Sequence, residues 1–316
     1  MTGATAEKFI VEADFDDYVT LLKPRVMSLA VFTAAVAIVA APGFVHPVIA
    51  LASILFIAVG AGASGALNMW WDSDIDGIMR RTRNRPVPAG RVRREDAFAL
   101  GAWLSGFSVV MLGLTANLLA AGLLAFSIFF YVVIYTVCLK RVTPQNIVIG
   151  GAAGALPPVI GWAVATEGIG TAAILMFLLI FIWTPPHFWA LALFVKDDYA
   201  DAGIPMLTVT HGNRTARWQI LAYTALLVPV SLLLAFSEVG GPATLLAAVW
   251  LNASFLSAGL ALVRRTDSQS NKDGWTAERR MFRISLVFLF ALFAAVAADA
   301  VLRPILDGFL HWPHLV

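Results

Sequence analysis

The stretch "NMWWDSDID" at residues 68–76 sets an amide and three carboxylates close together. Asn68, Asp72 and Asp76 are four residues apart, a spacing that stacks side chains on one face of a helix, each roughly 6 Å further along. Aligned carboxylates repel each other, and at the end of a helix they also meet the negative end of its dipole. The arrangement therefore favours a bound cation. Carboxylate and amide oxygens are donors that suit Mg²⁺.

A second acidic stretch, "KDDYAD" at residues 196–201, contains Asp197, Asp198 and Asp201. Asp197 and Asp201 repeat the spacing of four residues. Like the first stretch, it follows a long apolar segment. We expect the two stretches to face each other and to hold one or two Mg²⁺ between them. The alternative is that the first aspartates form a solvated cap paired with the arginines that follow.

Basic residues near these carboxylates predict a phosphate-containing ligand. Mg²⁺ held by a few protein oxygens commonly completes its shell with substrate phosphates, and the arginine guanidinium binds phosphate oxygens in a fork. The other interpretation is attraction to anionic lipid headgroups, to which we assign Arg91, Arg93 and Arg94. The candidate diphosphate-binding residues are Arg81, Arg83, Arg85, Lys140 and Arg141.

The elements that position these residues are predicted to be membrane-spanning helices. The chain is 59% hydrophobic and 13% charged, with a mean hydropathy of +0.81. Its apolar runs have the length of about 20 residues that a helix needs to cross a bilayer, and they lack the polar face of a soluble helix. The sequence predicts an all-α polytopic membrane protein with nine such helices, at residues 26–41, 48–69, 98–117, 120–139, 146–165, 171–194, 218–237, 242–263 and 282–302.

The helix order predicts one transmembrane domain over residues 1–316 with two similar halves. The halves cover roughly 20–140 and 141–265, and each places carboxylates at the end of its second helix. A final helix at 282–302 follows them.

The distribution of charge predicts the orientation in the membrane. With nine helices, all but one of the 22 Lys and Arg residues fall on one side, Arg303 being the exception. The positive-inside rule assigns that side to the cytoplasm, together with the N-terminus and both acidic stretches. The acidic N-terminus lacks the features of a cleaved signal peptide, and a single cysteine excludes a disulfide framework. The partner that we expect is the lipid bilayer, and we expect no nucleic acid.

Several motifs together resemble the intramembrane aromatic prenyltransferases of the UbiA type. "NMWWDSDID" is similar to the first aspartate-rich motif of that superfamily, N-x-x-x-D-x-x-x-D. Five further stretches resemble one branch of this superfamily, the haem O synthases. They are "LLKPRVM" at 21–27, "RTRNRPVPAGRV" at 81–92, "YTVCLKRVTPQNIVIGGAAGALPPVIGW" at 135–162, "WTPPHFWALAL" at 183–193 and "DDYADAGIPML" at 197–207.

The superfamily resemblance implies nine helices around a central cavity, Mg²⁺ and a prenyl diphosphate. The branch implies farnesyl transfer from farnesyl diphosphate to the 2-vinyl group of haem B in the bacterial cytoplasmic membrane. It also suggests haem A synthase or an oxidase assembly factor as a partner. The second superfamily motif is often D-x-x-x-D, whereas "DDYAD" shares the "DY" pair with the branch, so Asp198 is the preferred metal ligand there. The expected catalytic residues are Asp72, Asp76 and Asp198.

His187 lies in "WTPPHFW", where we expect Pro185 and Pro186 to break the helix within the membrane. Such breaks usually line a cavity. His187 is therefore predicted to ligate haem iron, to orient a propionate or to bond a carbonyl freed by the prolines. Trp183 and Trp189 are the other candidate haem-binding residues, although packing explains them equally well.

Two alternative functions differ in chemistry. One is prenylation of a quinone precursor, against which "TPPHFW" and "DDYADAGIPML" argue. The other is a membrane carrier of lipid or haem, which would need no paired acidic stretches and would show access routes on both faces.

Overall fold

A computed structural model of the chain describes residues 13–306 and 312–315. Over that part the regular structure is helical and contains no strand, as predicted. Eight helices are long and apolar enough to span a bilayer. They are α3 (Pro47–Trp71), α5 (Arg94–Thr115), α6 (Leu118–Phe129) continued by η1 (Phe130–Leu139), α7 (Asn146–Thr166), α8 (Thr171–Phe194), α11 (Gly212–Ala235), α12 (Pro242–Val263) and α14 (Thr276–Leu306).

The candidate for a ninth span in the described residues is the pair α1 (Phe15–Leu21) and α2 (Pro24–Ala40), which are bent by 52° at the break between them. At this break Lys23 adopts the left-handed conformation, with φ 51° and ψ 51°. Pro24 then begins α2, a position where its missing N–H costs no helical hydrogen bond. The nine segments are those predicted from the apolar runs, with ends shifted by a few residues. Residues 1–12, and with them the predicted side of the N-terminus, lie outside the described residues.

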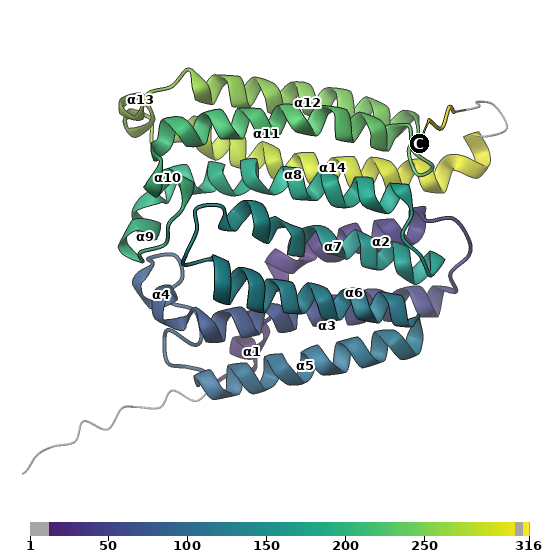
Figure 1. Cartoon of the computed structure of the whole chain (residues 1–316), viewed down its shortest axis with the longest axis horizontal. Coiled ribbons are helices and arrows are strands. Elements are labelled where there is room, and N and C mark those ends of the chain that lie inside the picture. Colours follow the sequence, from purple (N-terminus) through teal and green to yellow (C-terminus); the bar gives the residue numbers. More distant parts are fainter. Residues whose placement is uncertain (1–12, 307–311, 316) are drawn as a thin grey trace, which may run out of the picture.

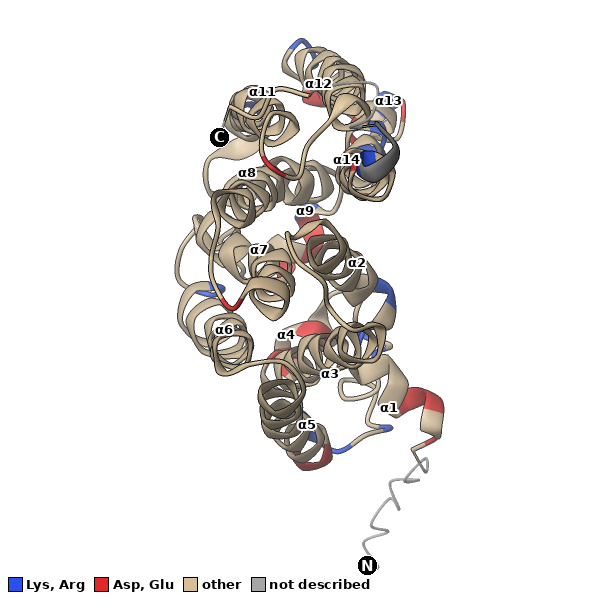
Figure 2. Cartoon of the chain, turned by 90° about the vertical axis from the view of Figure 1, so that its right-hand side faces the viewer, with Lys and Arg blue, Asp and Glu red and all other residues tan. Residues whose placement is uncertain are grey.

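Four short helices lie in the connections at one end of the bundle, on the left in Figure 1. They are α4 (Ser73–Ile78), α9 (Lys196–Asp201), α10 (Leu207–Thr210) and α13 (Asp267–Lys272). Figure 2 looks onto the opposite end, where the nearest loops are mostly uncharged. The two acidic stretches therefore lie at the same end of the bundle, as the helix order predicts.

The helices pack as neighbours around α2 and α7, which lie in the middle of the bundle (Figure 1). The largest apolar core is formed by α8, α11, α12 and α14 together with parts of α2 and α7. A second core joins α2 and α7 to α3, α5 and α6. Small residues allow these contacts: a Cβ atom on Gly161 of α7 would lie 2.2 Å from the carbonyl oxygen of Ala34 in α2.

The expected break in the helix at Pro185 and Pro186 is wrong. Both prolines lie inside α8, which continues from Thr171 to Phe194. Prolines remove N–H donors, but a buried membrane helix can keep its course when neighbouring helices and nearby hydroxyl groups support it. Both prolines are buried, and the Thr184 hydroxyl donates to the Ile180 carbonyl at 2.7 Å in the same region of the helix.

The close approach of α7 to α2 can be tested with a matched pair of substitutions. Gly161→Ala forces a methyl group against the α2 backbone and should lower the free energy of unfolding by about 1–3 kcal/mol. Gly154→Ala in the same helix meets no atom within 4 Å, so it should be neutral or stabilise by up to about 1 kcal/mol through helix propensity. Denaturant titration in micelles gives both values. Equal changes in the free energy of unfolding for the two variants would show that the α2–α7 contact is not tight.

Candidate functional site

The first acidic stretch is a buried polar cluster at the junction of α3 and α4. Asp72 is the residue between the helices, and the backbone bonds from Asp72 N to Asn68 O (2.9 Å) and from Asp76 N to Asp72 O (2.8 Å) maintain the helical spacing. Asn68, Asp72 and Asp76 are 5%, 0% and 2% exposed. The three side chains predicted to share one face are thus all buried. The alternative is wrong in expecting a solvated cap, although Asp76 does pair with Arg85, one of the arginines that follow.

Basic side chains from three separate segments meet this cluster. Lys23 Nζ donates to Asn68 Oδ1 at 2.6 Å, and Arg85 Nη1 donates to Asp76 Oδ2 at 2.6 Å. Lys140 Nζ donates to Asp72 Oδ2, which also accepts from Asn68 Nδ2 at 2.8 Å. Of these bases, Arg85 and Lys140 were predicted near the carboxylates, whereas Lys23 was missed.

The π-helical segment η1 brings Thr136 and Lys140 to the cluster. Its hydrogen bonds span five residues, as in Lys140 N to Tyr135 O at 2.8 Å, and the Thr136 hydroxyl similarly donates to Tyr131 O at 2.8 Å. Thr136 Oγ1 accepts from Asn68 Nδ2 at 3.1 Å. Wide turns of this kind are rare and often occur at functional sites. The pattern of apolar residues does not predict this π-helical segment. The polar side chains within this predicted membrane span are the sequence feature that could have indicated it.

Arg141 binds the exposed Asp74, which points away from the three buried side chains. Its Nη1 and Nη2 atoms lie 2.7 Å from the two carboxylate oxygens, and this pairing lowers the pKa of Asp74 below its usual value. Nη2 also lies 3.5 Å from Asp72 Oδ1. Arg141 therefore reaches the first acidic stretch, as predicted.

The second acidic stretch forms α9, where a tyrosine rather than an aspartate is buried. Asp197 and Asp201 are exposed, Asp198 is half-buried and Tyr199 is 5% exposed. Arg81 Nη2 donates to the Tyr199 hydroxyl at 3.0 Å, and its guanidinium carbon lies 5.3 Å from the centre of the ring. An apolar cluster beneath this contact joins α4 to α9 and includes Ile75, Met79, Tyr199, Ile204 and Met206.

The two acidic stretches thus meet through Arg81 and Tyr199, and their carboxylates do not converge. Within residues 13–306 and 312–315, no three His, Cys, Asp or Glu side chains are placed to hold one metal ion. A metal site shared by the two stretches stays a prediction. Tyr199 was missed as a contact residue, although it belongs to the "DY" pair noted in the sequence.

The oxygen donors of the first stretch suit a magnesium ion. Asp72 Oδ1 is buried and accepts no hydrogen bond in the described part of the chain, and Arg141 Nη2 lies 3.5 Å from it. A buried carboxylate oxygen without a hydrogen bond is costly, so it favours a closer cation. With the amide oxygen of Asn68 and the carboxylate of Asp76, it offers the hard oxygen ligands that Mg²⁺ prefers. The residues present therefore fit this ion.

His187 is held between aromatic rings at the contact of α8 and α14. Its ring stacks on Trp183 at 4.4 Å and on Phe282 at 4.7 Å. Nδ1 lies 2.7 Å from Ser285 Oγ, which donates its own hydrogen to Phe282 O at 2.6 Å. In the tautomer that carries its proton on Nδ1, His187 donates to Ser285 and keeps the lone pair on Nε2.

The two other candidate haem-binding residues, Trp183 and Trp189, lie in different surroundings. Trp183 lies with His187, because its Nε1 donates to Ser285 O at 2.8 Å. Trp189 packs against Tyr223 of α11, with ring centres 5.5 Å apart. The hydrogen bond of His187 goes to the Ser285 hydroxyl, so the alternative of a carbonyl freed by the prolines is wrong.

The fold and this site define an intramembrane helical bundle with buried carboxylates and bases at one end. The chain belongs to the UbiA prenyltransferase family, whose match covers residues 29–287. It is 62% identical over 293 residues to a protoheme IX farnesyltransferase of Roseobacter denitrificans, covering 93% of each chain.

Two solved structures have the same fold at low sequence identity. A structure from work on digeranylgeranylglyceryl phosphate synthase is 14% identical, with a TM-score of 0.72 over 90% of this chain and 98% of that one. A UbiA homolog from Archaeoglobus fulgidus bound to DMAPP and Mg²⁺ is also 14% identical, with a TM-score of 0.61 over 89% and 99% of the two chains.

The link between the two acidic stretches predicts a local effect of Tyr199→Phe. This change keeps the ring but removes the hydroxyl that accepts from Arg81, a bond worth about 1.5–3 kcal/mol because the donor is charged. Hydrogen exchange of residues 196–206 should therefore quicken roughly tenfold or more. Tyr223→Phe is the control, since its hydroxyl makes no hydrogen bond with described residues. No difference between the variants would show that the Arg81 contact does not hold α9.

Proposed function

We propose that this chain is an integral-membrane protohaem IX farnesyltransferase. It transfers the farnesyl group of farnesyl diphosphate to the 2-vinyl group of haem B, forms haem O and releases diphosphate. The supporting observation is the buried Asn68–Asp72–Asp76 cluster with its bases, in a chain 62% identical to a protoheme IX farnesyltransferase. A carrier would have no need for such a cluster.

Asn68, Asp72 and Asp76 are the proposed Mg²⁺ ligands of the first acidic stretch. Asp198 is the preferred ligand of the second, with Asp197 and Asp201 beside it on α9. The A. fulgidus homolog with the same fold binds Mg²⁺ together with a prenyl diphosphate, which supports this assignment. When bound, the ion supplies positive charge that stabilises the departing diphosphate.

The basic residues are proposed to bind the diphosphate oxygens. Arg85 and Lys140 already lie at the cluster, and Arg141 lies beside it. Arg81 extends from the first acidic stretch to α9, and Arg83 is exposed between Arg81 and Arg85. Arginine forks and the lysine ammonium stabilise the charge that develops as the C1–O bond of farnesyl diphosphate breaks.

The apolar walls of the bundle then decide where the allylic cation goes. Exclusion of water favours attack by the vinyl group, which forms the new carbon–carbon bond with C1 of the farnesyl group. The second cation, next to the porphyrin, takes a hydroxyl from water and releases one proton. The products are the hydroxyethylfarnesyl substituent and diphosphate, so atoms and charge balance.

The haem half of the site is assigned to His187, Trp183 and Trp189. The lone pair on His187 Nε2 is available for iron, while Ser285 fixes the ring through Nδ1. His187 lies seven residues, or roughly 10 Å along the helix axis, before the end of α8 at Phe194, and α9 with Asp198 follows that end. This separation suits a porphyrin whose vinyl group faces the acidic end.

The orientation is proposed from the charge distribution. The end with α4, α9 and the basic residues faces the cytoplasm of a bacterial inner membrane, together with the N-terminus. The chain is proposed to form one domain whose halves, 20–140 and 141–265, are pseudo-repeats. The placement of α4 after α3 and of α9 after α8 supports this division. Haem A synthase or an oxidase assembly factor is the proposed protein partner.

The function is tested by incubating the purified protein with haem B, farnesyl diphosphate and Mg²⁺ and measuring haem O by mass. Asp72→Ala and Asp198→Ala should each lower turnover at least a hundredfold, because the metal and diphosphate lose an anchor. Asp72→Asn tests the same point with less disturbance of the buried site. Asp96→Ala is the control, since Asp96 pairs with Arg93 at the start of α5. Normal haem O production by folded Asp72 and Asp198 variants would refute the metal assignment.

The haem assignment predicts a spectral change in His187→Ala. Loss of an axial ligand should shift the Soret band of the haem-loaded protein and weaken haem binding roughly tenfold or more. Farnesyl diphosphate binding should change little. Phe188→Ala is a control that removes a neighbouring ring without removing a nitrogen ligand. If the spectrum of His187→Ala equals that of the wild type, His187 serves only to join α8 to α14.

A further inference from the structure

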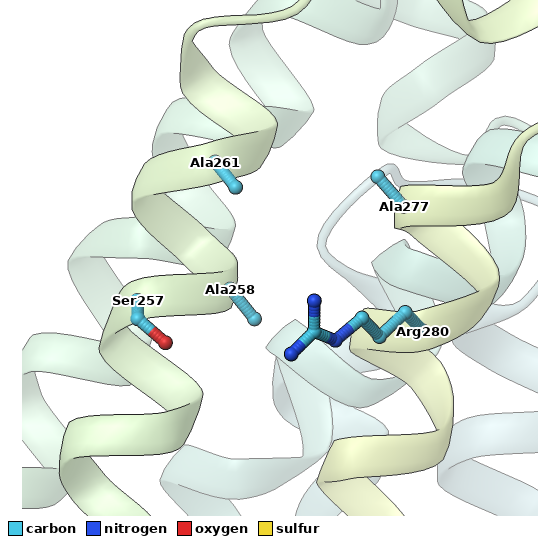
Figure 3. A pocket seen from close by; sticks show the side chains of 5 residues that line it. All are labelled: Ser257, Ala258, Ala261, Ala277 and Arg280. Carbon is cyan, nitrogen blue, oxygen red and sulfur yellow. The ribbon is translucent and has the colours of Figure 1, made fainter.

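A small groove lies between α12 and α14, away from the buried carboxylates. It has a volume of about 80 Å³ and is lined by Ser257, Ala258, Ala261, Ala277 and Arg280. Figure 3 shows the side chain of Arg280 extending from α14 toward Ser257 and Ala258 on α12. Ser257, Ala261 and Arg280 are exposed, so the groove opens onto the outer surface of the bundle.

The acidic residues near this groove are already bound by two other arginines. Asp267 and Glu278 bind the buried Arg217, at 2.9 and 3.2 Å. Asp273 binds Arg265 at 2.5 Å. These ion pairs connect α13 to α11 and α14. They also neutralise the carboxylates of the acidic residues near the groove.

The remaining basic side chains near the groove form no ion pair with an acidic residue in the part of the chain that the structure describes. Arg280 makes no ion pair or hydrogen bond with any residue that the structure describes. Arg279 lies over the Phe194 ring at 4.5 Å and donates to a backbone carbonyl. Arg264, Lys272 and Arg283, which are close to the lining residues in the sequence, are exposed. The groove is therefore a positively charged surface whose central guanidinium is free to bind an anion.

The position of the groove places it at the level of lipid headgroups. It lies near the C-terminal end of α12 and in the first turns of α14, at the end of the bundle that holds most of the basic residues. Trp275, next to the start of α14, is of the residue type enriched at the membrane surface. Further from this end of the bundle, both helices expose large apolar side chains: Val249, Trp250, Leu286 and Val287.

We propose that this groove binds one anionic phospholipid, with the headgroup phosphate on Arg280 and the acyl chains along α12 and α14. The Arg280 guanidinium offers a fork of donors to phosphate oxygens. Ser257 only lines the facing wall, because its hydroxyl donates to the Ser254 carbonyl at 2.8 Å. The alanine side chains leave room for the headgroup. Basic pockets between membrane helices commonly recognise anionic lipids in this way. The site lies apart from the proposed farnesyl diphosphate site, so either proposal can fail without the other.

Native mass spectrometry of the full chain in micelles tests the proposal, with phosphatidylglycerol added at increasing concentration. Arg280→Gln should weaken binding of the first lipid about fivefold, the effect of roughly 1 kcal/mol per basic residue at the membrane surface. Arg94→Gln is the matched control, because it removes an exposed arginine at the start of α5. Ala261→Leu fills the groove without changing charge and should also weaken binding.

Three results would overturn the proposal. Equal losses in Arg280→Gln and Arg94→Gln would indicate diffuse attraction. Equal binding of zwitterionic phosphatidylcholine would show that the anionic headgroup is not recognised. Displacement of the lipid by millimolar inorganic phosphate would assign the groove to a free anion.

Discussion

The burial of two carboxylates at the end of a membrane helix is the constraint on which this structure depends. An unpaired charge in such surroundings costs several kcal/mol, and removing one partner of a buried pair costs about 3–5 kcal/mol. Asp72 and Asp76 are therefore stable only because Lys140 and Arg85 reach them. These bases come from different parts of the chain, so the surrounding segments must be shaped to deliver them.

Two irregular backbone segments contribute to this polar cluster. At the break between α1 and α2, the left-handed conformation of Lys23 directs its ammonium to Asn68. Gly62 and Gly65 of α3 allow this break to approach, since a Cβ atom on either would lie 3.1–3.3 Å from Leu22 or Leu21. On the other side, the wide turns of η1 carry Thr136 and Lys140. Strained or unusual backbone of this kind persists where the surrounding packing holds it, which is common at functional sites.

The sequence could predict what depends on local pattern. The nine spans follow from apolar runs of sufficient length, and the common face of Asn68, Asp72 and Asp76 follows from their spacing. The contact of Arg81 with Tyr199, which joins residues 118 positions apart, depends on how the halves pack and has no local signal. The continuity of α8 through Pro185 and Pro186 also depends on packing between helices. Support from neighbouring helices overrides the local preference of proline to end a helix. The contact of Lys23 with Asn68 also has no local signal, since it depends on the bend between α1 and α2.

The proposed function adds a consequence for how the two ligands bind. Lys140 and Arg85 neutralise Asp72 and Asp76 in this structure, so they cannot also bind diphosphate at full strength. They become available to phosphate oxygens only when another cation takes their place on the carboxylates. Binding of the metal and of the diphosphate is then mutually favourable, because each relieves the charge that the other leaves unpaired. Asp197 and Asp201 of α9 are exposed and Asp198 is half-buried, and none of the three forms an ion pair with a described residue. In the proposed site, the first acidic stretch therefore has its carboxylates already paired with bases, whereas the aspartates of α9 are proposed to complete the metal site without displacing one.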